Sequence, residues 1–370
     1  MKFNNSIRAL TLLFAFCLSV LAQTPQSTPP KVQNPEDDDE IIKVDSRLVI
    51  VPVSVTDTLG QPILGLKVQD FRIQEDNKLQ EIAQVSDAEK VPLEIALLID
   101  VSGSVNPLFE FEKKAAAQFL ESVMKPEDKA TIFLIGDQPA LAQERDSAQK
   151  AAVQVRAIVP SGKFTAFYDT VTTAARYLQK NSPLRSRRVI LALTDGEDNW
   201  SNMTREAEKD TYRDFDVNNL TQEKLNKLAA KTDSAHRVAQ DKILRDLQNA
   251  DTVFYVINPA GDSYRLNKIS TRAQNGLQKF SEQTGGTAFL PNFFPTNLKD
   301  QLQNSANTKI NEATLAKIFR SLANELQAQY LVQYYSEGDF PNNKYVKLNV
   351  NLSKPEKLRV RARQGYFVKN

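Results

Sequence analysis

The chain has 370 residues, and at roughly 100–200 residues per domain this length allows two domains or one large domain with additions. Apolar residues make up 41% and charged residues 25% of the chain, a balance typical of a globular protein with a buried core. The formal net charge is +2, and no arginine-rich stripe alternates with aromatic residues. We therefore exclude nucleic acid from the predicted partners.

Residues 1–22 are predicted to be a secretory signal peptide. Lys2 and Arg8 make the start of the chain positive, and residues 9–20 form an apolar run. That run is shorter than the about 20 residues that a membrane span needs. Residues 20–22, Val-Leu-Ala, end the run with small residues, so we expect cleavage after Ala22. The alternative is an uncleaved membrane anchor.

The cysteine content agrees with export but adds no chemistry. Cys17 is the single cysteine, and it lies inside the apolar run with the bulky Phe16 before it, so lipidation is the less favoured interpretation. After cleavage the chain has neither a thiol nor a membrane span, and disulfides play no part. We expect a secreted or periplasmic protein.

The next segments are a linker and a β segment. Residues 23–43 are rich in Pro, Thr, Gln and Ser and include the acidic run 36–40, a composition typical of a disordered linker. Residues 44–90 are predicted to be β structure, because valines alternate at positions 49, 51, 53 and 55 and turn-forming residues occupy 57–62 and 76–78. This β segment is too short to build a core alone.

Residues 91–310 alternate between buried strands and helices. The apolar runs that predict parallel strands are 93–99, 130–135, 188–193, 252–257 and 287–290. The helical patterns between them are 109–124, 147–158, 167–179, 224–249 and 269–283. This alternation predicts an α/β fold with a doubly wound, mostly parallel sheet.

Residues 311–370 are predicted to be a helix followed by β structure. The helix spans 315–328, and the β runs are 330–335, 345–352 and 358–368. Because neither terminal β segment can bury a core by itself, we expect 44–90 and 311–370 to pack together as one β-sandwich-like domain. The α/β domain would then be inserted between them. Two separate small units are the alternative.

A group of oxygen-bearing side chains follows the first strand of the α/β region. Asp100 ends that strand, and Ser102 and Ser104 follow in a turn that Gly103 allows to bend tightly. In an open α/β sheet, ligands sit beyond the carboxyl ends of the strands. A carboxylate with two hydroxyls suits a hard cation such as Mg²⁺ or Mn²⁺. The alternative is that these residues only cap the following helix.

Two further groups are expected at the same edge of the sheet. Thr165 lies in a loop before a helix, and Asp195 follows the strand 188–193 within the sequence Thr-Asp-Gly. Their positions weaken the helix-capping alternative, because capping does not require them.

In this order, the Asp-x-Ser-x-Ser sequence, the later threonine and the Thr-Asp-Gly sequence resemble the metal-ion-dependent adhesion site of von Willebrand factor type A domains. The resemblance spans residues 93 to about 291. It implies that Asp100, Ser102, Ser104 and Thr165 bind one divalent ion, Mg²⁺, Mn²⁺ or Ca²⁺, directly or nearly so. It implies that Asp195 acts through water. The flanking segments, such as 284–287, 330–334 and 361–366, resemble bacterial secreted proteins related to this family.

Several residues depart from that pattern or carry other expectations. Lys163 and Phe164 stand where related domains often have small residues, and a lysine there would lower cation affinity or help to hold an acidic ligand. The polar stretch 197–249 is predicted to be a helical insertion beside the metal face. His236, the only histidine, is expected to be a solvated surface residue. Trp200 is expected at the rim of the site or as a loop anchor.

The resemblance predicts an exported, cation-dependent protein-binding module of the adhesion type, not an enzyme. With Asp100 as the one direct anionic ligand, the ion would keep net positive charge and attract an Asp or Glu of a protein partner. One alternative is a metal-dependent hydrolase, although no general base other than the metal-site carboxylates is visible. The other is a metal-independent envelope assembly module that binds through exposed β edges.

Overall fold

The structure is a computed structural model. It describes residues 47–102, 107–162, 164–213, 221–261, 267–296, 299–354 and 357–369. The predicted signal peptide at 1–22 and the linker at 23–43 lie outside the described residues. Among the described residues, no helix has both the length and the apolar character that a membrane span requires.

A six-stranded sheet forms the centre of the α/β region. In spatial order its strands are β10 (Ala288–Phe289), β9 (Thr252–Ile257), β8 (Arg187–Leu193), β5 (Leu93–Asp100), β6 (Lys129–Ile135) and β7 (Pro139–Asp146). All neighbouring pairs are parallel except β6 with β7. Every residue of β5 from Leu93 to Ile99 is buried, because both faces of the sheet are covered.

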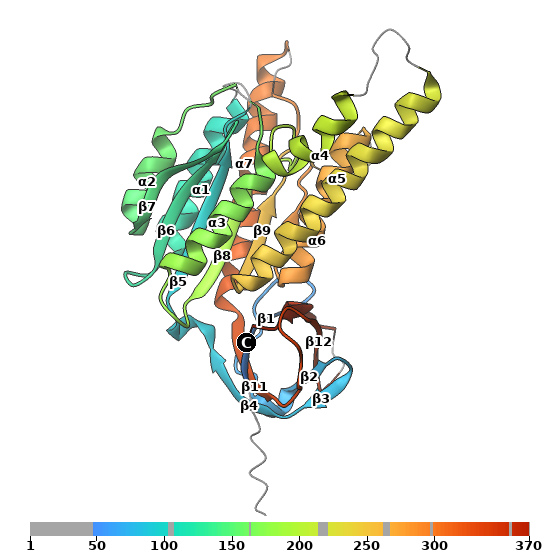
Figure 1. Cartoon of the computed structure of the whole chain (residues 1–370). Helices are drawn as coiled ribbons and strands as arrows, with labels where there is room; N and C mark the ends of the chain where they lie inside the picture. The colour runs from blue at the N-terminus through green and yellow to red at the C-terminus, as the bar shows by residue number, and fades with distance from the viewer. Residues whose placement is uncertain are drawn as a thin grey trace, which may run out of the picture. The chain divides into compact units, whose positions relative to one another are not determined.

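Helices cover the sheet on both faces (Figure 1). One apolar core joins the sheet to α1 (Pro107–Val123), α2 (Ala148–Ala157) and α7 (Gln301–Gln327). A second core joins its other face to α3 (Phe167–Asn181), α5 (Gln222–Asn249) and α6 (Lys268–Thr284). The remaining helix, α4 (Asn202–Arg213), contacts α3 and α5. The predicted doubly wound α/β fold is confirmed.

The order of the strands defines where this sheet can bind a ligand. From β5 the chain moves to β6 on one side, and it later returns to place β8 on the other side of β5. The connections therefore diverge between β5 and β8, and ligands of open α/β sheets bind at the carboxyl ends of the strands at such a switch point. Asp100 and Thr194 lie at these two ends.

The two terminal β segments form two four-stranded sheets. The first has the order β13 (Arg359–Ala362), β1 (Arg47–Thr56), β11 (Gln329–Ser336) and β4 (Ile82–Asp87). The second has the order β14 (Gly365–Phe367), β12 (Tyr345–Leu352), β2 (Phe71–Glu75) and β3 (Lys78–Gln80). Short 3-10 helices occupy Val68–Asp70 and Ala88–Lys90. Each sheet thus mixes strands from both ends of the chain.

One apolar core lies between these two sheets. Val51 and Val53 of β1 share it with Val332 of β11, and Ile73 of β2 and Val346 of β12 complete it from the second sheet, all of them fully buried. The alternating burial of β1 and β12 explains the pattern, since every second side chain faces this core. The β segments therefore form a sandwich, as expected, while the exact domain boundaries stay a prediction.

Some predicted elements differ from the structure. Helix α7 begins at Gln301, well before the predicted start at 315, because Asp300 caps it by accepting hydrogen bonds from the amides of Leu302 and Gln303 at 2.9 and 3.1 Å. The predicted strand 358–368 is two strands, β13 and β14, which belong to different sheets. Edge strand β7 was not predicted, whereas helix α4 lies within the stretch 197–249 that was predicted to be helical.

Two expectations about the stretch 197–249 need correction. From Ala235 onward, α5 is part of the core on one face of the sheet, with Ile243 and Leu247 fully buried. Only the earlier part can be called an insertion. His236 is 4% exposed, so the prediction of a solvated surface histidine was wrong. Its Nδ1 atom lies 3.1 Å from the hydroxyl of Tyr168 on α3.

Candidate metal-binding site

Asp100 is held at the switch point by hydrogen bonds to both of its carboxylate oxygens. Its Oδ1 atom accepts from the amide and from the hydroxyl of Ser102, at 3.0 and 2.6 Å. Its Oδ2 atom accepts from the hydroxyl of Thr194, at 2.7 Å. Because these hydroxyls give their protons to Asp100, their oxygen lone pairs stay available to a cation.

The loop that carries Thr165 is fastened to the same edge of the sheet. The carbonyl of Val101 accepts from the amides of Ser161 and Gly162 at 2.7 and 3.3 Å. The amide of Ala166 donates to the carbonyl of Gly136, just beyond β6, at 2.6 Å. Thr165 itself is 5% exposed. The backbone of β5 and β6 therefore sets the position of this loop.

A third loop, after β8, joins the first two. The amide of Thr165 donates to the Asn199 side chain at 2.8 Å, and its carbonyl accepts from the amides of Asn199 and Trp200, each at 3.1 Å. Asp198 is buried behind this contact and accepts from the amide of Tyr168 at 2.9 Å. Burial raises the pKa of the Asp198 carboxyl, while its hydrogen bonds act in the opposite direction.

The Thr-Asp-Gly sequence makes a tight turn at the end of β8. Gly196 has a φ of +76°, and a Cβ atom there would lie 2.6 Å from Cγ of Leu277 on α6. Both facts require glycine. The turn brings the Glu197 amide to Oδ1 of Asp195, at 2.9 Å, and the Glu197 carboxylate accepts from the hydroxyl of Ser270.

The carboxylates at this edge repel one another. The pKa of Asp195 is raised to about 6, first by burial and then by the charges of Asp100 and Glu197. The pKa of Glu112 on α1 is raised to about 8 by burial and by the charge of Asp100. The Oε1 atom of Glu112 is buried and has no hydrogen-bond partner among the described residues. A cation at this edge would relieve this repulsion.

The structure brings together part of the predicted ligand set. Asp100 and Ser102 are in direct contact, and Asp195 lies close enough for Asp100 to shift its pKa. Thr165 is joined to them through the loops described above. Ser104 and Lys163 lie outside the described residues. The described carboxylate and hydroxyl groups fit a hard divalent ion, which prefers oxygen ligands.

The described residues contain no group of three or more His, Cys, Asp or Glu side chains arranged to hold a metal ion. The predicted site does not belong to that type, because its ligands are carboxylates combined with hydroxyls. It would therefore bind an ion with few fixed negative charges.

Some residues of the site were missed from the sequence. Thr194, Asn199 and Glu112 were given no role, because only the fold places them beside Asp100 and Thr165. Phe164 and Trp200 form a stacked aromatic pair, with ring centroids 4.3 Å apart and planes 9° apart. The guanidinium of Arg205 lies 4.9 Å from the Trp200 ring centroid. This aromatic platform adjoins Thr165, since Phe164 precedes it and Trp200 binds its carbonyl.

An open α/β sheet with oxygen ligands at its switch point belongs to the doubly wound class of ligand-binding domains. Residues 95–197 match the family model of the von Willebrand factor type A domain. Over these residues the chain therefore matches the von Willebrand factor type A domain, as the resemblance implied. None of the curated proteins matches the chain significantly.

Several solved structures match this chain at low identity and low TM-score. A von Willebrand factor type A protein from Catenulispora acidiphila is 14% identical with a TM-score of 0.40, over 76% of this chain and 51% of that one. An aerotolerance-related membrane protein from Bacteroides fragilis is 16% identical with a TM-score of 0.34, over 60% and 97%. Proximal thread matrix protein 1 from the mussel byssus, with a zinc-occupied MIDAS motif, is 14% identical with a TM-score of 0.39, over 68% and 50%. These scores are too low to assign a function.

Proposed function

We propose that this protein is an exported, divalent-cation-dependent binding module whose ion receives an acidic side chain of a protein partner. The observation that carries the proposal is the arrangement around Asp100. Its two oxygens hold the hydroxyls of Ser102 and Thr194 at the switch point, beside a second carboxyl, Asp195, whose pKa the charge of Asp100 helps to raise. Von Willebrand factor type A domains are in general interaction modules, and we propose no catalytic step.

The predicted site residues would have different roles in binding the ion and the partner. Asp100, Ser102, Ser104 and Thr165 would bind the ion directly or nearly so, and Asp195 would act through water. A bound ion, Mg²⁺, Mn²⁺ or Ca²⁺, would supply positive charge and an open coordination position. Phe164, which is 54% exposed, and Trp200 would offer an apolar surface to the partner beside its acidic group.

Titration calorimetry with Mg²⁺ and Mn²⁺ on the purified chain tests the ion site. Asp100→Ala is expected to weaken binding by more than about a hundredfold, because even residues that only orient metal ligands often cost 10–100-fold. Ser102→Ala should cost less, since water can replace a neutral hydroxyl, and Asp195→Ala should fall between them. Glu144→Ala, which removes an exposed carboxylate on β7, is the matched control.

Wild-type affinity for Mg²⁺ and Mn²⁺ in folded Asp100→Ala would contradict the ion site, and the helix-capping interpretation would replace it. Partner binding is tested separately by capture from an envelope extract with and without EDTA. Capture that EDTA does not reduce would favour the metal-independent alternative. Mass spectrometry of the mature amino terminus tests export, and a chain that still begins at Met1 would contradict it.

A further inference from the structure

A second candidate binding site lies at the amino ends of the parallel strands of the α/β sheet, opposite the ends that carry Asp100 and Asp195. A cavity of about 550 Å³ is lined by Val91, by residues 184–189 around the start of β8, by β1 and β11 of the sandwich and by the end of the chain. Its volume falls in the range of small-molecule sites, roughly 300–1,000 Å³. Because β8 has seven residues, and a strand rises about 3.3 Å per residue, this cavity lies roughly 20 Å from Asp195.

The walls of this cavity carry an excess of positive charge. Its cationic lining residues are Arg47, Arg185, Arg187, Arg188, Arg363 and Lys369. Among the described residues, the acidic one in the lining is Asp251, which is paired with Arg363 at 2.6 Å. Neither Arg185 nor Arg188 forms an ion pair with any residue that the structure describes. This imbalance favours an anionic occupant.

Several donors in this wall are buried without a hydrogen-bond acceptor. The Nε atom of Arg188 has no partner among the described residues, although its Nη1 atom donates to the Ala250 carbonyl at 3.0 Å. The Arg363 side chain is 10% exposed, and its Nε atom is likewise buried and unpartnered. The Nη2 atom of Arg363 donates to the Ile50 carbonyl at 2.9 Å. These Nε atoms are covered, so an anion in the cavity would be attracted by the net charge of the guanidinium groups rather than by these two atoms.

The lining of the cavity also includes exposed apolar side chains. Leu184 is 91% exposed and Leu48 is 40% exposed, and both line the cavity. Arg185 follows Leu184 directly and has a left-handed backbone, with a φ of 67°, which turns this loop at the mouth. An occupant would therefore meet guanidinium groups and an apolar surface together.

We propose that this cavity binds a small amphipathic anion, a carboxylate or phosphate monoester head group with a short apolar tail. The head group would lie against Arg188 and Arg363, with Arg185 adding charge at the mouth, and the tail would cover Leu48 and Leu184. The site works without the divalent ion and does not depend on the function proposed above.

Titration calorimetry on the purified chain tests the proposal with four probes. Hexyl phosphate and hexanoate are expected to bind at one site per chain. Hexylammonium, which has the same tail and the opposite charge, should not bind. Inorganic phosphate, which lacks the tail, should bind at least about tenfold more weakly than hexyl phosphate, because burying a six-carbon tail contributes favourably to binding. Raised salt should weaken binding of both anions.

Variants locate the probe in this cavity. Arg185→Glu is expected to weaken hexyl phosphate binding about tenfold or more, whereas Arg185→Lys retains most of it. Lys180→Glu reverses an exposed charge at the end of α3, outside the cavity, and serves as the matched control with unchanged affinity. Asp100→Ala should also leave this binding unchanged, which separates the site from the ion site.

Three results would overturn the proposal. The first is the absence of saturable binding of both hexyl phosphate and hexanoate. The second is equal affinity for hexylammonium. The third is equal affinity in Arg185→Glu and Lys180→Glu, with thermal melts showing that both variants are folded.

Discussion

At the scale of single residues, the fold uses polar side chains to connect loops that are far apart in the chain. Thr194 and Asp100 are 94 positions apart, yet their side chains are hydrogen bonded. Asn199 bonds the backbone of Thr165 in the same way. Each contact fixes one predicted ligand, Asp100 or Thr165, relative to the loop after β8. Under the proposed function, this positioning lowers the entropic cost of binding an ion.

His236 gives a residue-scale prediction about pH. Its pKa is lowered from 6.5 to about 4, first by burial and then by the charge of Arg272, while the charge of Asp233 acts in the opposite direction. Because the folded-state pKa lies below the unfolded one, the unfolded chain takes up the proton first as the pH falls. The contribution of His236 to the free energy of unfolding is fully present above pH 6.5 and is lost towards pH 4, by on the order of 3 kcal/mol.

Urea unfolding of the wild type and of His236→Gln between pH 7.5 and about 4 measures this effect. As the pH falls, the free energy of unfolding of the wild type should decrease relative to that of His236→Gln. Asp195 and Glu112, whose raised pKa values have the opposite pH dependence, are present in both proteins and cancel in the difference. A difference that does not change with pH would show that His236 is not kept neutral by the fold.

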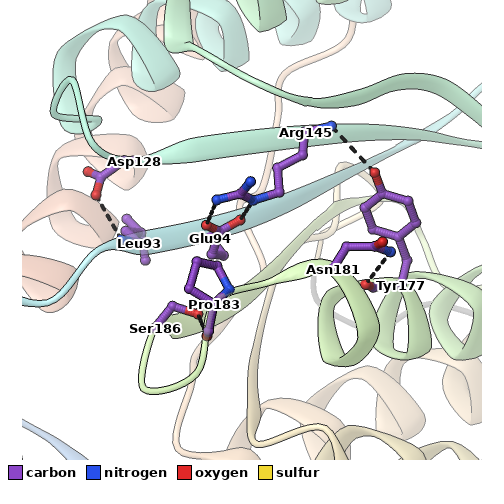
Figure 2. Close-up of polar contacts among 8 residues, drawn as sticks. All are labelled: Leu93, Glu94, Asp128, Arg145, Tyr177, Asn181, Pro183 and Ser186. Carbon is purple, nitrogen blue, oxygen red and sulfur yellow. Dashed lines mark hydrogen bonds and ion pairs between the residues drawn. The ribbon is translucent and has the colours of Figure 1, made fainter.

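At the scale of elements, the edge strand β7 is tied to the centre of the sheet by an ion pair. Figure 2 shows Arg145 of β7 reaching Glu94 of β5, and both nitrogen–oxygen contacts are 2.7 Å. Strand β6 lies between these two strands, so the arginine crosses it. The Glu94 side chain is 1% exposed, and its hydrogen bonds raise the pKa of Arg145.

Arg145→Ala is therefore expected to destabilise the protein by about 3–5 kcal/mol, because it leaves a buried carboxylate without its cation. Lys150→Ala is the control, since it breaks an exposed pair with Asp146 and should cost less than about 1 kcal/mol. The free energy of unfolding in urea gives both values. Equal losses in the two variants would mean that the buried pair contributes no more than a surface pair.

At the scale of the whole molecule, the sandwich joins the two ends of the chain. Glu75 of β2 is 2% exposed. Its Oε1 atom accepts from the hydroxyls of Tyr334 and Tyr366 at 2.7 and 2.6 Å, and its Oε2 atom accepts from Ser336 at 2.8 Å. Tyr334 and Ser336 belong to the facing sheet, so this carboxylate connects both sheets and residues more than 250 positions apart.

Glu75→Leu is expected to cost on the order of 3 kcal/mol, because it leaves three hydroxyl groups without their acceptor. Glu75→Gln keeps an acceptor oxygen and should cost less, about 1 kcal/mol. Glu81→Gln, on an exposed position of the same β segment, controls for loss of charge. Urea unfolding ranks the three variants, and wild-type stability of Glu75→Leu would show that the network does not hold the sandwich together.

The sequence alone predicted the α/β class, the strands that lead to Asp100 and to the Thr-Asp-Gly turn, and a sandwich of the two terminal segments, with two separate small units as the alternative. These follow from local patterns: continuous apolar runs become buried strands, alternating valines become half-buried ones, and parallel strands end at one edge. The von Willebrand factor type A domain was recognised from the same residues and their order.

Only the tertiary structure decided the contacts between distant side chains. The burial of His236 depends on Tyr168 of another helix, and the early start of α7 depends partly on Asn307 and Asn311, which bond the backbone at 294–295. The raised pKa of Glu112 and the cavity beside Arg185 are likewise absent from any local pattern. For the buried polar groups, the free energy depends on hydrogen-bond partners and charges that periodicity does not reveal.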